Sequence, residues 1–462
     1  MIIRICYLFP FYFRPVDDFY SHYGIRKDFR TYSKSVKFNN KTYAFAAIDA
    51  TLVPGPKRPF NFFGSLSQAE LIEAEQVIKK SAQNSDYQLI FGHYPTSCIL
   101  SPDPGIRSLL KSSLAYLCGH LHTLNGLAPH MYSSQPGDFL ELELGDWKDN
   151  RIFRILVVDQ GQLSFQDQVF NRTTSPSPKL SVITNPIDMT YVQPQNFELI
   201  AKSSHIRALV FDPKVDTVQA TIDDHDQFVL KRAQAGHPLF TAEWNPSQYD
   251  DGQVHHLTML ENKIQFSLTS SPSLGLAELI SKIVLFFNWS QVTQGAFGCA
   301  AASVILPLSF LRSSKSQGGK MQKIAKNDAL FYAFVLSALY ISVGPWALGY
   351  FLDESLGLLF PWGLWIDGHI LPADVTHLYG LVFIFPYLYM LFGALVIYQK
   401  RPSWRYKLIS NVIFAIVLIL QILHCIEFYL CYGVLATLIG TCGVGRLAFV
   451  FYVRKHAHEL LY

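Results

Sequence analysis

Residues 87–122 contain two short apolar runs that each end in Gly-His, QLIFGHYPTS (88–97) and LAYLCGHLHT (114–123). Such a run, closed by glycine, is typical of a buried strand that ends in a tight loop, because glycine lets the backbone turn sharply and come close to a ligand. The imidazoles that follow belong to His93, His120 and His122. Neutral imidazole is a common ligand of divalent metal ions. The two runs therefore predict half of a metal site.

A single histidine after glycine is a weak signal, because a lone histidine is more often a hydrogen-bonded structural residue than a ligand. Two strand-Gly-His units in series, the second ending Gly-His-Leu-His, favour the metal site. Upstream, Ser67 and Glu70 form a capping-box pattern before the apolar positions Leu71, Ile72, Ala74 and Val77. This pattern predicts a helix that leads into the strand at 88–91, and hence an α/β arrangement.

The histidine pattern resembles the C-terminal half of the calcineurin-like metallophosphoesterases, in which a Gly-His loop and a Gly-His-x-His loop supply ligands to a two-metal centre. Through residues 46–64, 101–110 and 141–155 the sequence is also similar to the transmembrane protein 62 family, from about Phe19 onward. The resemblance implies an α/β sandwich, divalent metal ions as cofactors and a phosphate ester as substrate. It also implies that His93, His120 and His122 are metal ligands.

The superfamily's metal site also contains Asp-x-His, Gly-Asp-x-x-Asp and Gly-Asn-His-Asp/Glu motifs, which this sequence lacks at the required place. Three neutral imidazoles do not balance the charge of two cations, and two-metal catalysis needs both cations to be fixed. We therefore expect residues 1–170 to be the C-terminal part of an N-terminally truncated phosphoesterase domain with little or no activity. An alternative start or a diverged, non-catalytic member fits the same pattern. The catalytic residues are unknown. If this chain alone were active, its catalytic carboxylates would be sought among residues such as Asp49, Asp138 and Asp146, of which we expect Asp49 and Asp146 to be structural.

A Ser/Thr/Pro-rich linker, NRTTSPSPK (171–179), follows this domain. The next residues form short β-rich runs separated by turn residues, which predicts a small β-sandwich over 178–272. The family resemblance implies that this module is immunoglobulin-like. Its residues His237, His255 and His256 have no ligand spacing, so we expect surface or structural roles for them.

The composition is too apolar for an entirely soluble protein, with 50% hydrophobic residues and a mean hydropathy of +0.19. The excess lies after residue 290, in stretches that each reach the roughly 20 residues needed to cross a bilayer. We predict an all-α, multi-pass transmembrane region of about five helices over residues 290–455. The fold class is then α+β. The five stretches are 292–311, 329–352, 375–398, 408–430 and 433–453.

Lysine and arginine gather in alternate connections of this region, whereas residues 353–374 contain four acidic residues and neither lysine nor arginine. The positive-inside rule makes the basic connections cytoplasmic and the region before residue 290 lumenal or extracellular, in the secretory pathway or plasma membrane. The glycosylation sequons at Asn40, Asn171 and Asn288 all lie in that region. The basic residues are Arg312, Lys315, Lys320, Lys323, Lys326, Lys400, Arg401, Arg405, Lys407, Arg454 and Lys455.

Two further groups of ionisable residues lie in or near the apolar stretches. His424 and Glu427 are three residues apart on one predicted helix, and we expect them to lie near the interface or to bond a neighbouring helix. The acidic segment with Asp367, His369, Asp374 and His377 resembles a metal site only by composition. We expect an interfacial or re-entrant segment anchored by Trp362 and Trp365.

Two classes of function fit the sequence. The first is a membrane-tethered, metal-dependent phosphoester hydrolase acting on a lumenal or extracellular phosphate ester. The second is a non-catalytic membrane receptor, adaptor or binding protein that retains the fold. The expected partners are the lipid bilayer and a phosphate ester. The net charge of +3 is carried largely by the predicted cytoplasmic loops, so we expect no nucleic acid partner.

Overall fold

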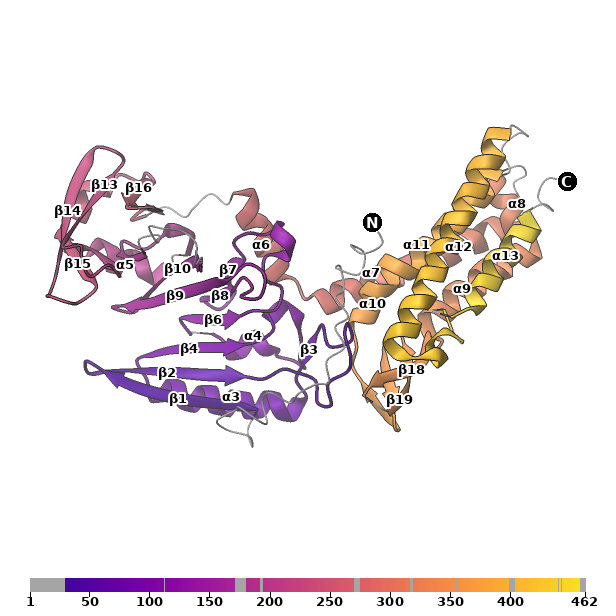
Figure 1. Cartoon of the computed structure of the whole chain (residues 1–462), viewed down its shortest axis with the longest axis horizontal. Coiled ribbons are helices and arrows are strands. Elements are labelled where there is room, and N and C mark those ends of the chain that lie inside the picture. The colour runs from indigo at the N-terminus through magenta and orange to yellow at the C-terminus, as the bar shows by residue number, and fades with distance from the viewer. Residues whose placement is uncertain are drawn as a thin grey trace. The chain divides into compact units, whose positions relative to one another are not determined.

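A computed structural model describes residues 30–111, 113–170, 180–191, 194–269, 275–315, 319–353, 355–398, 404–438, 440–441 and 443–457 (Figure 1). The chain forms two compact units. Among the described residues, the sheet unit comprises residues 30–50 and 66–287, and the helical unit comprises residues 51–65 and 288–457. The predicted linker 171–179, with the sequon Asn171, lies outside the described residues.

The first part of the sheet unit is a six-stranded sheet with the order β1-β2-β4-β6-β8-β7, and its strands lie side by side in Figure 1. The four central strands are parallel, and the outer strands β1 and β7 pair antiparallel with their neighbours. All four central strands therefore end at the same edge. The strands are β1 (Thr31–Phe38), β2 (Lys41–Ile48), β4 (Tyr87–Gly92), β6 (Ala115–Cys118), β7 (Tyr132–Gln135) and β8 (Phe139–Glu143).

Alternate residues of the central strands face opposite sides of this sheet. Ile90, Tyr116 and Phe139 share one buried cluster with helices α3 (Gln68–Gln83) and α4 (Ile106–Leu109). On the other side, Leu89 and Leu142 share a cluster with Leu163 of the hairpin β9 (Ile152–Asp159) and β10 (Gln162–Val169). The result is a helix layer, a sheet and a hairpin layer.

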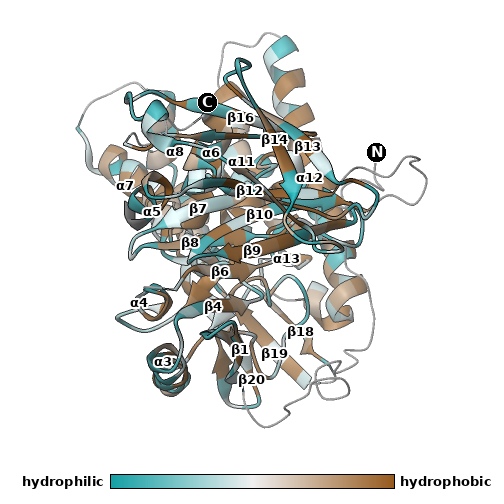
Figure 2. Ribbon diagram, turned by 90° about the vertical axis from the view of Figure 1, so that its left-hand side faces the viewer, coloured by the Kyte–Doolittle hydropathy of each residue, from teal (hydrophilic) through white to brown (hydrophobic). Residues whose placement is uncertain are grey.

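Helix α3 begins at the predicted capping box, since the Ser67 hydroxyl accepts from Glu70 N (3.3 Å) and Ser67 N donates to the Glu70 carboxylate (2.8 Å). Leu71, Ala74 and Ile78 are its buried apolar residues, while the predicted Ile72 is 44% exposed. In Figure 2, α3 carries both brown and teal residues, in keeping with one apolar and one polar face.

The second part of the sheet unit is an antiparallel, seven-stranded sheet with the order β11-β12-β15-β14-β13-β16-β17 and one helix, α5 (Pro194–Ala201). Its two ends meet, because Asn262 Nδ2 of β17 donates to Ser181 O of β11 (2.7 Å). The sheet thus curls around an apolar core that includes Phe240, Leu257 and Phe266. The strands are β11 (Ser181–Asn185), β12 (His205–Val210), β13 (Thr217–Ile222), β14 (Asp226–Arg232), β15 (Leu239–Glu243), β16 (His255–Met259) and β17 (Asn262–Phe266).

The helical unit contains three helices long and apolar enough to cross a membrane, Trp289–Ser313, Val375–Tyr398 and Trp404–Tyr432, within the residues that the structure describes. A fourth span results if the bent pair α8 and α9, at 86° to each other, is counted as one. The prediction of about five helices stays a prediction. The helices are α7 (Trp289–Ser313), α8 (Lys320–Lys326), α9 (Asp328–Val343), α10 (Val375–Tyr379), α11 (Phe385–Tyr398), α12 (Trp404–Tyr432) and α13 (Gly445–Ala457).

The helical unit also contains a four-stranded antiparallel sheet that the sequence analysis did not predict. The apolar stretch 329–352 changes from helix to strand at Gly344-Pro345, because proline does not continue a helix. Asp367 and Gly368, both at positive φ, turn the chain between the last two strands. The strands are β18 (Ala347–Leu352), β19 (Ser355–Phe360), β20 (Gly363–Ile366) and β21 (His369–Leu371).

The segment 51–65 packs on this small sheet. Phe60 contacts the rings of Phe351 (5.4 Å between ring centroids) and Tyr432 (5.5 Å). Lys57 N donates to Phe351 O (2.8 Å), and the Tyr432 hydroxyl donates to Arg58 O (2.7 Å). The chain therefore leaves the sheet unit after β2 to complete the helical unit and then returns to form α3.

A buried histidine links two turns of the seven-stranded sheet. His255 Nδ1 lies 2.7 Å from Asp223 Oδ2, and its Nε2 lies 3.1 Å from Asp251 Oδ1. Burial disfavours the charged imidazole, but the hydrogen bonds with the two carboxylates outweigh it and raise the pKa of His255 above its ordinary 6.5. This histidine has a structural role, as expected.

We predict that the stabilising effect of His255 depends on pH. A raised pKa means that the contribution is fully present below about pH 6.5 and is lost as the pH rises through the folded-state value. In hydrogen exchange of the full chain, His255→Gln should therefore reduce the protection of β13 and β16 amides more at pH 6 than at pH 8. Comparing variant and wild type at each pH removes the intrinsic pH dependence of exchange. An equal loss at both pH values would contradict the prediction.

Candidate histidine site at the sheet edge

The shared edge of the four parallel strands carries the predicted site residues. Asp49 follows β2, His93 follows β4, His120 follows β6 and Asp146 lies three residues after β8. In open α/β sheets, ligands bind beyond the carboxyl ends of the parallel strands. The Gly-His units therefore place their imidazoles where such a sheet binds its ligand.

The structure brings His93 and His120 together. His93 Nε2 and His120 Nδ1 are 3.1 Å apart, and the two rings meet edge to face with centroids 4.9 Å apart. The Tyr94 ring packs beside both of them. His122 is exposed and has a positive φ of 55°. No cluster of three or more histidine, cysteine, aspartate or glutamate side chains with metal-site geometry occurs among the described residues.

Glu143 holds the loop that carries His120 and His122, a role that sequence reasoning missed. Its carboxylate is 1% exposed and accepts hydrogen bonds from His120 N and His122 N, the latter at 2.9 Å. Burial raises the pKa of Glu143 to about 7, although backbone hydrogen bonds from residues 120–122 oppose the shift. The only signal in the sequence was the alternation Glu-Leu-Glu in a strand whose even positions are apolar.

Glu141 lies two residues earlier on the same face of β8 and is completely buried. Its carboxylate accepts from Thr96 N (2.6 Å), Thr96 Oγ1 (2.8 Å) and Gln135 Nε2 (2.7 Å). Arg107 donates to the same threonine hydroxyl (2.9 Å). Burial raises the pKa of Glu141 to about 7 against these hydrogen bonds. Glu141 thereby fixes the segment that follows His93.

Of the three aspartates considered as alternative catalytic carboxylates, Asp49 and Asp146 make local ion-pair or hydrogen-bond contacts. Asp49 lies 3.5 Å from the Arg30 guanidinium. Asp146 accepts from Asp149 N (2.5 Å) and Asn150 N (3.2 Å); these hydrogen bonds overcome partial burial and lower its pKa. Asp138 precedes β8 and so lies at the opposite end of that strand.

Two cavities adjoin the histidine loops. A cavity of about 390 Å³ is lined by His93, Gly119 and Arg154 among others. A smaller cavity of about 180 Å³ is lined by His122, His130 and Glu143, with Asp167. Arg154 forms an ion pair with Asp167 (2.6 Å), so both charges are neutralised locally.

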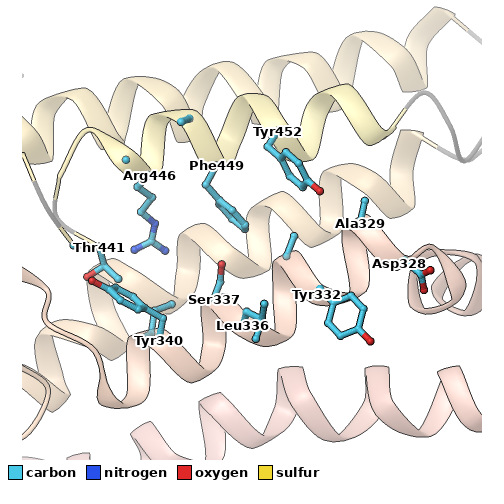
Figure 3. Close-up of a pocket in the computed structure, with 15 residues that line it drawn as sticks. Asp328, Ala329, Tyr332, Leu336, Ser337, Tyr340, Thr441, Arg446, Phe449 and Tyr452 are labelled. Carbon is cyan, nitrogen blue, oxygen red and sulfur yellow. The ribbon is translucent and has the colours of Figure 1, made fainter.

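A cavity of about 870 Å³ lies in the helical unit between α9 and α13 (Figure 3). Its walls are mostly apolar and aromatic: Tyr332 and Leu336 line it from α9, and Phe449 and Tyr452 extend from α13 towards α9 in Figure 3. Arg446, also on this wall, is buried and donates to Ile384 O (2.8 Å). The arginine thus has a local structural role.

Three of the other candidates in the helical unit, His424, Asp374 and His377, make hydrogen bonds or ring contacts. The His424 imidazole lies 3.0 Å from the Tyr379 hydroxyl, so this histidine bonds a neighbouring helix as expected. Asp374 accepts from the Ser290 hydroxyl, and His377 packs edge to face on Phe297. Trp362 and Trp365 are 42% and 44% exposed.

Two sequons lie within the described residues. Asn40 is exposed in the turn between β1 and β2. Asn288 is half-buried, and its side-chain oxygen caps α7 by accepting from Gln291 N (3.3 Å). The two sites therefore differ in their accessibility to a modifying enzyme.

Comparison with known proteins identifies the family of this chain. The chain is 31% identical to transmembrane protein 62 of Mus musculus over 471 residues, which covers 94% of this chain and 70% of the mouse protein. The chain belongs to the transmembrane protein 62 family. Residues 176–264 match the TMEM62 Ig-like domain family. With its apolar helices, the chain is a membrane protein.

A second relative connects the chain with the metallophosphoesterases. A protein of Arabidopsis thaliana, whose name marks it as a candidate metallophosphoesterase, is 24% identical over 360 residues. The match covers 63% of this chain and 48% of the plant protein. The predicted resemblance to both families is thereby confirmed, and with it the mixed α+β fold that includes an immunoglobulin-like domain.

We predict that the two glycines of the Gly-His units differ in their tolerance of a side chain. A Cβ at Gly92 would lie 2.4 Å from the Tyr116 hydroxyl and 2.9 Å from Ile48 O, whereas a Cβ at Gly119 meets no atom within 4 Å. Gly92→Ala should therefore lower the free energy of unfolding of the sheet unit by about 1–3 kcal/mol, the usual cost of overpacking. Gly119→Ala is the matched control and should change it little. Chemical denaturation of the purified chain measures both, and equal effects would refute the close approach at Gly92.

Proposed function

We propose that this chain is a multi-pass membrane protein whose sheet unit carries the histidine-bearing half of a metal-dependent phosphoester hydrolase site. The observation that carries the proposal is the hydrogen-bonded pair His93 and His120 at the carboxyl edge of the parallel strands. The similarity to the plant protein supports the choice of phosphate esters as the substrate class.

The described residues do not complete a metal site. As ligands, the two paired imidazoles would bring no negative charge, His122 is exposed on the same loop, and Asp49 lies beside Arg30. A two-metal centre needs carboxylates that balance the cations. The proposal therefore assigns to this chain a weak metal site and little hydrolysis until further carboxylates are added.

The incomplete set of ligands at the sheet edge supports a second candidate function. Without three clustered ligands among the described residues, the sheet edge could bind a phosphate ester as a receptor or adaptor does, through hydrogen bonds rather than chemistry. Metal binding separates the two candidates, because a binding module has no need of it.

The proposed orientation places the sheet unit on the lumenal or extracellular side. Its support is Arg312 in the last turn of α7 together with the lysine-rich helix α8, which lies between α7 and α9. The connection 353–374 on the other side of α9 has no lysine or arginine. This asymmetry is the pattern of the positive-inside rule. Lys400 and Arg401, in the basic connection before α12, lie outside the described residues.

The first test of the proposal is metal binding. We expect the purified chain to bind Zn²⁺ or Mn²⁺ weakly, and His93→Ala or His120→Ala to weaken that binding further, because each removes one of the two converging imidazoles. Isothermal titration calorimetry measures the affinity. His225→Ala, at an exposed histidine of the seven-stranded sheet, is the matched control.

Activity gives the second half of this test. In a form extended upstream with the acidic motifs of the superfamily, His120→Ala should abolish hydrolysis of a generic phosphodiester while leaving expression intact. Metal-dependent hydrolysis by the present chain alone would refute the incomplete site. Metal affinity that is unchanged in both histidine variants would favour the binding module instead.

The proposed orientation predicts which asparagines carry glycans. Asn40 is exposed in a turn, whereas the Asn288 side chain caps α7 next to an apolar span. In a lumenal sheet unit, Asn40→Gln and Asn171→Gln should each remove one glycan-dependent mass shift on gels, and Asn288→Gln should remove none. In sealed microsomes, protease should cleave the connection 312–326 and spare the sheet unit. Cleavage of the sheet unit without detergent would reverse the orientation.

A further inference from the structure

Helix α6 (Leu276–Phe286) joins the sheet unit to the first apolar helix, and one of its faces is exposed and apolar. Leu276, Leu279, Ile283 and Phe286 follow one another at spacings of three and four residues, so they form one stripe along the helix. Their exposed fractions are 75%, 44%, 40% and 41%, and that of the next residue, Phe287, is 45%. A stripe of this size is unusual on a surface that faces water.

The opposite face of α6 is fixed to the sheet unit. Leu285 is fully buried in a cluster with Ala128 and Met131. Its carbonyl accepts from Arg107 Nη2 (2.6 Å) and Gln135 Nε2 (3.0 Å).

The middle of the same face is bonded as well. The Ser281 hydroxyl is buried and donates to backbone carbonyls, including that of His130. The helix is therefore not free to turn its apolar stripe inward.

The chain itself indicates what covers the stripe. Helix α7 begins at Trp289, so only Phe287 and Asn288 separate it from α6, and their extended length is at most about 10 Å. With 25 residues, α7 is about 37 Å long, more than the roughly 30 Å of the hydrocarbon core. One end of α7 must then reach the headgroup region, and the apolar stripe continues to within two residues of its start.

We propose that the exposed stripe of α6 lies in the interfacial layer of the bilayer, so that α6 is an amphipathic anchor that precedes the first span. Lys282 is exposed between Leu279 and Ile283 and can extend its ammonium group to the lipid headgroups while its alkyl chain stays with the apolar residues. The other ionisable residue of the helix, Glu278, is half-buried and lines a cavity of the sheet unit.

Fluorescence quenching in the full chain tests this position. An environment-sensitive fluorescent amino acid is placed at Ile283, and in a second variant at Lys282, whose exposed side chain tolerates replacement. The proteins are reconstituted in vesicles of phosphatidylcholine and phosphatidylserine. The matched control carries the same label at Val229, an apolar residue of β14 that is 52% exposed.

We expect lipids with a nitroxide near the headgroup to quench both α6 labels several-fold more than the Val229 label, and aqueous iodide to show the reverse order. Iodide quenching of the α6 labels as strong as that at Val229 would overturn the proposal. Labels on α6 that neither quencher reaches would overturn it too, because a protein surface would then cover the stripe. Neither readout depends on metal binding or hydrolysis.

Discussion

The conformation of the histidine loop depends on one buried carboxylate, that of Glu143. Taking a carboxylate out of water costs several kcal/mol unless hydrogen bonds replace the lost hydration. The amides of His120 and His122 donate such hydrogen bonds, and both amides belong to the histidine loop itself. The buried position of Glu143 and the conformation of the loop thus stabilise each other, because both depend on the same hydrogen bonds. The loop conformation is therefore held by hydrogen bonds to the neighbouring strand β8.

Glu141 is held in the same way, and its contacts reach the end of α6. It lies on the same face of β8. Gln135, which donates to Glu141, and Arg107, which donates to Thr96, both also donate to the carbonyl of Leu285 at the end of α6. Leu121, between the two histidines of the loop, packs against the same cluster as Leu285. One strand therefore connects the histidine loop and the helix before the first span through buried polar contacts. Such networks are costly when incomplete, so removing one partner should affect both regions.

The sequence predicted elements that depend on local patterns and missed features that depend on partners. The capping box of α3 and the two strand-Gly-His units each depend on residues that are close together in the sequence, and the structure contains them as predicted. Strand β18 was missed because the apolar stretch that contains it has the composition of a membrane helix, although Gly344-Pro345 was a visible signal. Strands β19–β21 lie in the connection 353–374, where the Asp367-Gly368 turn was visible. The roles of Glu141 and Glu143 could not be predicted, since the sequence indicates neither the burial of a glutamate on a strand nor hydrogen-bond donors that are distant along the chain. Ile72 fits the predicted apolar face of α3 but is exposed, because the sheet covers a narrower stripe.

The geometry of the histidine edge also explains why the motifs alone do not define a catalytic centre. Parallel strands deliver Asp49, His93, His120 and Asp146 to one edge, which is the part that spacing predicts. Charge balance is a separate requirement. The two carboxylates at this edge bind a guanidinium or loop amides, while the converging donors are neutral imidazoles. A cation placed there would gain nitrogen ligands but little charge compensation, since a neutral imidazole adds none. Adding carboxylates at this edge, without changing the histidines, is therefore the alteration that should raise metal affinity most.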